Sequence, residues 1–112
     1  MANLYPGAAL VNMLSVASWK GNARTVAYSA SKAAQWSLTD APREGLRDQG
    51  TLVVGVHAGY VDTDGAAWLD VPKIGPAEVA AKTMQALLDD RAEVLVDDAA
   101  LRLKATLSQP LD

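Results

Sequence analysis

Three short apolar runs, spaced widely along the chain, predict three buried strands. They occupy positions 7–14, 51–56 and 93–97, and the second is rich in β-branched residues. Nearly continuous apolar runs of this length are typical of strands that are buried on both faces of a parallel sheet. The runs therefore predict a small sheet whose strands are joined by long connections.

A helical pattern fills positions 26–47, between the first two runs. Small or apolar side chains recur there at steps of three or four and predict a buried stripe. The stripe consists of Ala27, Ala30, Ala34, Leu38 and Ala41. Pro42 and Gly45 lie inside the pattern, so we expect the helix to be distorted or broken near Ala41. Gly50 is a suitable stop for it.

A second helix is predicted from Pro76 to about Asp90, before the third run. Proline in the first turn, with Glu78 just inside it, is favourable at a helix start. Its apolar stripe is formed by Val79, Thr83, Ala86 and Leu87. Positions 99–107 are weakly helical, and the long stretch from His57 to Gly75 is predicted to be a loop.

The order strand, helix, strand, helix, strand predicts the α/β class. Right-handed crossovers between such elements give a parallel sheet, here a partial Rossmann-type doubly wound sheet of about three strands with two main helices. We expect residues 1–112 to form a single domain. The strand within positions 8–14 would have a bare apolar edge, which invites association. We therefore expect a homo-oligomer.

Composition narrows the class of protein. The chain has 112 residues, of which 50% are apolar and 21% charged, and its formal net charge is −3. These values are typical of a globular domain and argue against a nucleic-acid or membrane-surface partner. There is no cysteine, and His57 is the only histidine, so we expect no disulfide and no metal site. With no long apolar run and no signal-peptide pattern, a cytoplasmic location is expected.

Tyr28 and Lys32 are the residues with the clearest chemical potential. They are four positions apart at the start of the first helix, so their side chains share one face. A neighbouring ammonium favours the phenolate form of a tyrosine, which can then exchange a proton with an alcohol or ketone oxygen. Ser15 follows the first strand, at the end of a parallel sheet where ligands bind.

These motifs together resemble the short-chain dehydrogenase/reductase family. Tyr28 and Lys32 match the family's Tyr-x-x-x-Lys motif, and Ser15 matches its catalytic serine after an Asn-x-Ser-Ser-type strand end. The segment 58–63, Ala-Gly-Tyr-Val-Asp-Thr, is similar to its Pro-Gly-x-Val-x-Thr segment. The resemblance runs from Gly7 to about Leu107 and covers only the C-terminal half of the family's usual fold.

The resemblance implies an NAD(P)-dependent oxidoreductase that interconverts a small-molecule alcohol and a carbonyl compound. It assigns Ser15 to the substrate oxygen, Tyr28 to proton transfer, and Lys32 to the tyrosine and the cofactor ribose. Gly59, Val61 and Thr63 would lie along the nicotinamide, so NAD or NADP is the implied cofactor. The hydride chemistry would belong to that cofactor.

Departures from the family pattern support a second expectation. Ala58 replaces the usual proline, Leu14 replaces the first serine of a pair, and Pro42 and Gly45 interrupt a helix that is long in the family. The sequence has no Gly-x-x-x-Gly-x-Gly loop and no Asn-Asn-Ala-Gly-like segment. The alternative is therefore a truncated, non-catalytic fragment or association module that binds no nucleotide by itself.

Other polar and aromatic residues have structural interpretations beside functional ones. Ser18 is a rival hydroxyl to Ser15 but is typical of a loop, and His57 at a strand end is expected to be structural. Asp62 and Asp64 suit loop solvation better than a metal pair. Trp36 is expected to pack in the core or at an interface, whereas Trp68 could line a substrate pocket.

Overall fold

The computed structural model describes residues 7–61, 70 and 73–111. Within them, three parallel strands form one sheet in the order β1-β2-β3. They are β1 (Ala9–Met13), β2 (Leu52–His57) and β3 (Glu93–Leu95). Ala9 is paired with Leu52 and Gly55 with Glu93. The predicted α/β class and the partial Rossmann-type sheet are confirmed.

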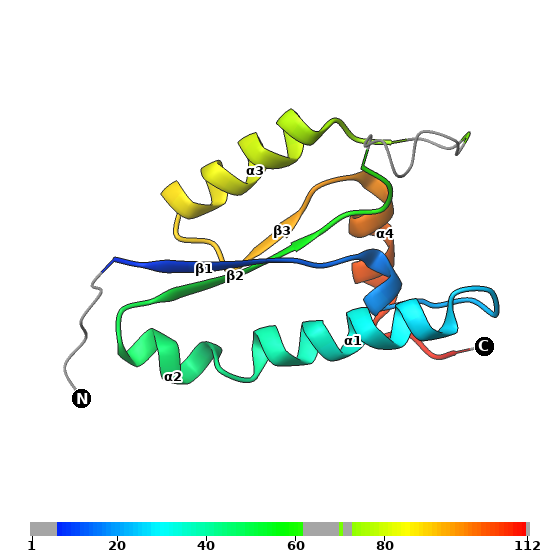
Figure 1. Cartoon of the computed structure of the whole chain (residues 1–112), viewed down its shortest axis with the longest axis horizontal. Coiled ribbons are helices and arrows are strands. Elements are labelled where there is room, and N and C mark those ends of the chain that lie inside the picture. The colour runs from blue at the N-terminus through cyan, green and yellow to red at the C-terminus, as the bar shows by residue number, and fades with distance from the viewer. Residues whose placement is uncertain (1–6, 62–69, 71–72, 112) are drawn as a thin grey trace.

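Helices cover both faces of the sheet. Helices α1 (Val26–Asp40) and α2 (Arg43–Asp48) run along one face, and α3 (Pro76–Leu88) runs along the other (Figure 1). A single 3-10 turn, η1 (Val16–Ser18), follows β1. Helix α4 (Asp98–Thr106) follows β3, in the region predicted to be weakly helical. The two main helices of the prediction correspond to α1, with α2 continuing it, and α3.

The predicted distortion near Ala41 is a complete break. Helix α1 ends at Asp40, Ala41 is its C-cap, and Pro42 is the N-cap of the six-residue α2. Pro42 has no N–H with which to continue the hydrogen-bond ladder, so a new helix starts after it. Arg43 then donates to the carbonyl of Val53 at 3.3 Å and holds α2 against β2.

The central strand is buried on both faces. Val54 and Val56 lie in the main apolar core beneath α3. The other members of that core are Ala58, Ile74, Val79, Ala86, Val94 and Val96. Of the predicted α3 stripe, Val79 and Ala86 are buried and Thr83 and Leu87 partly buried, so that prediction is confirmed.

The predicted apolar stripe of α1 is wrong. Ala27, Ala30, Ala34 and Ala41 are exposed, and Leu38 is 72% exposed. The buried position is instead Thr39, whose hydroxyl accepts a hydrogen bond from the Asn12 amide at 2.9 Å. The side of α1 that carries Thr39 thus meets the sheet through this polar pair, and the small-residue side faces away.

Strand β1 forms one edge of the sheet. The N–H of Leu14 and the carbonyl of Ala8 bond to β2, at 2.7 and 3.1 Å. Because backbone groups alternate sides along a strand, those of Ala9, Val11 and Met13 point away from β2. The apolar side chains of Leu10 and Met13 are also 43% and 47% exposed. Among residues 7–61, 70 and 73–111, no strand pairs with this side of β1, as the sequence led us to expect.

Candidate active site

Ser15 lies where β1 ends and is the N-cap of η1. Its Oγ accepts a hydrogen bond from the Ala17 N–H at 3.1 Å, and the residue is only 9% exposed. That bond uses an acceptor site of the hydroxyl and leaves its own proton available to another oxygen. The rival Ser18 is buried, and its hydroxyl donates to the Ser15 carbonyl at 2.7 Å. Ser18 therefore fixes the turn that carries Ser15.

Tyr28 and Lys32 lie together in the first turns of α1. The Lys32 Nζ is 5.9 Å from the centroid of the Tyr28 ring, and 47% of Tyr28 is exposed. The same Nζ donates to the Gln35 Oε1 at 3.2 Å and to the carbonyl of Met13 at 3.4 Å. The ammonium thus connects the tyrosine face of α1 to the end of β1, two residues before Ser15. In the described part of the chain, no hydrogen bond joins Ser15 to Tyr28.

The segment Gly59–Val61 continues from β2 at the same end of the sheet. The Ala58 carbonyl accepts from the Val16 N–H at 3.0 Å, which joins this segment to the turn that Ser15 begins. Val61 forms an isolated parallel bridge with Ile74, just before α3. The structure therefore brings Gly59 and Val61 to the Ser15 region. Thr63, also predicted to contact a cofactor, lies outside the described residues, as do Asp62, Asp64 and Trp68.

An apolar groove lies beside the carboxyl end of β1. It has a volume of about 390 Å³, and Met13, Val61, Val79 and Met84 are among its lining residues. Met13 connects this groove with Lys32, because the Lys32 ammonium bonds the Met13 carbonyl. Lys32 itself is not one of the lining residues, and the groove is bounded on its far side by α3.

His57 is a structural residue at this end of β2. It is 2% exposed, and its ring stacks on Trp19 with 4.1 Å between centroids and 19° between planes. Burial lowers the pKa of His57 to about 4, with Lys104 and Arg43 acting in the same direction and the Glu93 and Asp40 carboxylates opposing it. The imidazole is therefore neutral near pH 7.

Trp36, which the sequence placed in the core or at an interface, packs within the chain. Its ring meets that of Trp19 edge-on, with 5.9 Å between the ring centroids. Edge-on contacts of this kind stabilise aromatic pairs beyond the area they bury. Trp36 thus extends the stack of Trp19 and His57 towards α1.

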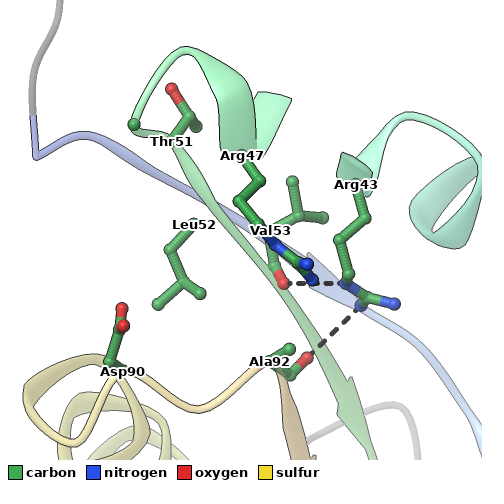
Figure 2. Close-up of a pocket in the computed structure, with 8 residues that line it drawn as sticks. Arg43, Arg47, Thr51, Leu52, Val53, Asp90 and Ala92 are labelled. Carbon is green, nitrogen blue, oxygen red and sulfur yellow. Dashed lines mark hydrogen bonds between the residues drawn. The ribbon is translucent and has the colours of Figure 1, made fainter. Parts of the chain in front are cut away.

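A second pocket lies at the opposite end of the sheet. Its walls come from α2, the start of β2 and the turn before β3, and include Arg47, Thr51 and Asp90 (Figure 2). Arg43 crosses this pocket to reach the carbonyls of Val53 and Ala92, at 3.3 and 3.4 Å. These bonds hold α2, β2 and the residue before β3 together, so we assign Arg43 a structural role.

Asp97 contacts this end of the sheet and was not singled out from the sequence. It follows β3, caps α4 and bonds the backbone N–H of Gly59 at 2.8 Å. A capping signal was present, because an aspartate stands between an apolar run and a weakly helical stretch. The contact with Gly59 has no such signal, since 38 positions separate the two residues.

Comparison with known proteins places the chain in a family. Residues 4–71, more than half of the sequence, match the family described as short chain dehydrogenase. The chain therefore belongs to the short-chain dehydrogenase family. No curated protein matches the chain.

Two solved structures share the fold. A short chain dehydrogenase from Burkholderia cenocepacia, solved in complex with NADP, is 28% identical with a TM-score of 0.82, over 90% of this chain and 44% of that one. A candidate short-chain dehydrogenase from Novosphingobium aromaticivorans is 17% identical with a TM-score of 0.74, over 96% and 39%. The chain thus spans less than half the length of either protein.

Two further observations bear on the kind of site. In residues 7–61, 70 and 73–111, no helix has the length and apolarity needed to cross a membrane. Over the same residues, no three histidine, cysteine, aspartate or glutamate side chains are grouped as a metal ion would need.

Proposed function

We propose that the chain is the C-terminal catalytic half of an NAD(P)-dependent oxidoreductase that interconverts a small alcohol and a carbonyl compound. The observation that carries the proposal is the placement of Lys32. Its ammonium lies beside the Tyr28 ring and reaches the carbonyl of Met13, at the strand end that leads to Ser15. Ser15, Tyr28 and Lys32 are the proposed catalytic residues, within a single domain of residues 1–112.

The chemistry of these residues follows from their hydrogen-bonding capacity. The Ser15 hydroxyl keeps its proton free and donates it in a hydrogen bond to the oxygen of the substrate. The Tyr28 hydroxyl gives its proton to the carbonyl oxygen during reduction and takes a proton from the alcohol during oxidation. The Lys32 ammonium stabilises the phenolate that remains after proton donation.

We propose that the cofactor is a nicotinamide nucleotide, NAD or NADP, held by Lys32 and by the segment after β2. Lys32, which bonds the Met13 carbonyl, is the proposed contact of the ribose. Gly59, Val61 and Thr63 are the proposed neighbours of the ring, and Val61 also lines the apolar groove beside Met13. When bound, the cofactor supplies or accepts the hydride. The sequence offers no glycine-rich loop for the pyrophosphate. The structure that is 28% identical was solved with NADP.

A calorimetric titration of the 112-residue chain with NADPH, and then NADH, tests the cofactor part. We expect saturable binding. Reduction of a generic aldehyde with NADPH then tests the catalytic part. Tyr28→Phe should lower turnover by about 100-fold or more, because general acid catalysis contributes at least that factor. The control is Tyr5→Phe, which changes the tyrosine outside both motifs.

Two outcomes would overturn the proposal. Turnover that survives Tyr28→Phe would exclude Tyr28 as the proton donor. Absence of binding at millimolar cofactor would favour the second candidate function, a non-catalytic association module. The open edge of β1 favours that candidate, because Ala9, Val11 and Met13 direct backbone groups away from β2 without a strand to pair with among the described residues.

We further propose that the chain is a cytoplasmic homo-oligomer with no nucleic-acid or membrane partner. The support for association is the apolar edge of β1, where Leu10 and Met13 are partly exposed. The absence of cysteine from the sequence supports a reducing compartment. The net charge of −3 argues against a nucleic-acid or membrane-surface partner.

A further inference from the structure

The Asp97 carboxylate divides its two oxygens between two elements. The Oδ1 accepts the N–H of Ala100 at 2.9 Å and caps α4. The Oδ2 accepts the N–H of Gly59 at 2.8 Å, across 38 positions of sequence. An ionised carboxylate has two acceptor oxygens and no donor, so it can bind both amides at full strength.

Gly59 is matched to this contact by its lack of a side chain. A Cβ at position 59 would lie 3.2 Å from the Asp97 Oδ2 and 3.4 Å from the Ala99 Cβ. With a side chain at position 59, the Asp97 carboxylate would have to shift by a few tenths of an ångström to keep this bond. The lack of a side chain at Gly59 therefore favours the close approach of Asp97.

The other attachments of the segment show what Asp97 adds. The Ala58 carbonyl is held by Val16, and the Tyr60 carbonyl accepts the Ile74 N–H at 2.9 Å. These two bonds attach the segment to the Ser15 turn and to the residues just before α3. The bond to Asp97 attaches the segment to the junction of β3 and α4. Loss of this bond would leave Gly59–Val61 attached only to the Ser15 turn and to the start of α3.

We infer that Asp97 is a positioning residue, which holds Gly59–Val61 in place against the Ser15 turn. The geometric part stands on the hydrogen bonds alone. The functional part rests on the proposed function, in which Gly59 and Val61 lie along the nicotinamide. Asp97 then acts on cofactor binding through Gly59 and touches neither cofactor nor substrate.

Amide hydrogen exchange, followed by NMR on the full 112-residue chain, tests the geometric part. In Asp97→Ser the single hydroxyl keeps the helix cap and is too short to bond both amides. We expect exchange of the Gly59 amide to rise at least tenfold, with the Ala100 amide changed less than threefold. Asp98→Ser is the matched control, because Asp98 is the neighbouring acid in the first turn of α4 and should leave Gly59 unchanged.

A second variant, Asp97→Asn, keeps the inference testable if Asp97→Ser does not fold. Asp97→Asn is nearly isosteric but has only one acceptor oxygen, so its NH₂ group would face one of the two N–H donors. Faster exchange of Gly59 in either variant supports the inference. Unchanged Gly59 exchange, with faster exchange at Ala100 alone, would show that Asp97 is only a helix cap and would overturn it.

Cofactor titration separates the inference from the proposed function. If the wild-type chain binds NADPH, Asp97→Ser should raise the Kd at least fivefold and Asp98→Ser should not. An unchanged Kd in a folded Asp97→Ser chain would refute the positioning role. If the wild-type chain binds no NADPH, the proposed function fails, and the exchange of Gly59 still decides whether Asp97 orders the segment.

Discussion

Two buried nitrogens distinguish the stacked pair of Trp19 and His57. The Trp19 Nε1 and the His57 Nδ1 have no hydrogen-bond partner within the described residues. A buried polar atom without a partner carries a desolvation cost, and a positive charge on the imidazole would add a larger one. The neutral imidazole is therefore the form that the fold accommodates, which links its stability to pH.

Stability should fall as the pH falls from about 6.5 towards 4. The pKa of His57 has its ordinary value of 6.5 in the unfolded chain but lies near 4 in the folded one. Between these two values the unfolded chain is protonated at His57 and the folded chain is not. The contribution of the neutral His57 to the free energy of unfolding, up to about 3 kcal/mol, is therefore present above pH 6.5 and lost by about pH 4. Urea unfolding from pH 7.5 to 4 measures this loss.

His57→Phe is the control for that titration, because it keeps a ring against Trp19 without an ionisable group. Its free energy of unfolding should vary less with pH than that of the wild type. Equal pH dependence of the two chains would show that His57 titrates normally in the fold.

At the scale of elements, the strands and helices could be located from the sequence more reliably than their buried faces. The three apolar runs, the break at Pro42 and the stripe of α3 were predicted because each depends on local residues. The buried face of α1 was not, because Thr39 is buried through its bond with Asn12, 27 positions away. The Asp97–Gly59 contact was missed for the same reason: periodicity reports an apolar face, not a polar partner distant in sequence.

The short helix α2 contains Gly45, whose replacement by alanine should increase the stability of the fold. A Cβ added at Gly45 would meet no atom within 4 Å beyond its neighbours and the backbone of its own helix, and the φ of this residue is not positive. Gly45→Ala should therefore stabilise the chain by about 0.5–1 kcal/mol, because alanine reduces the conformational entropy of the unfolded state. The shift in urea midpoint, at constant m-value, is the measurement.

Gly50 provides the opposite case for comparison. Its φ is +79°, a conformation that disfavours a Cβ, so Gly50→Ala should destabilise the chain by about 1 kcal/mol or more. If both substitutions were destabilising, the backbone conformation assigned to α2 would be wrong.

At the scale of the whole molecule, the open side of β1 is the main feature, because no described strand pairs with it. The sequence contains no charged residue before Lys20, so β1 lacks the charges by which edge strands commonly avoid association. Leu88 of α3 and Leu38 of α1 add exposed apolar surface on the two helices, at 76% and 72% exposure. The uncharged edge of β1 is the feature that supports the proposed association of copies.

Leu10→Lys should weaken that association. Leu10 lies in β1 and is 43% exposed, so a lysine there would place a charge on the edge without removing a bond to β2. Sedimentation velocity at micromolar to tens of micromolar protein should show an oligomer for the wild type and at least tenfold weaker association for the variant. Leu101→Lys, at a 53% exposed position on α4, is the matched control. A monomeric wild type across that range would contradict the proposal.

The parallel sheet also has a consequence for synthesis on the ribosome. Ala9 must wait for Leu52, its partner 43 positions later, because no hairpin within the described residues joins neighbouring strands. At ordinary translation rates that interval lasts about 2–9 s. During it, β1 lacks its β2 partner, and its apolar side chains are without the cover that the finished sheet gives them. Slow, long-range strand pairing, rather than weak helices, should therefore limit the yield of folded protein.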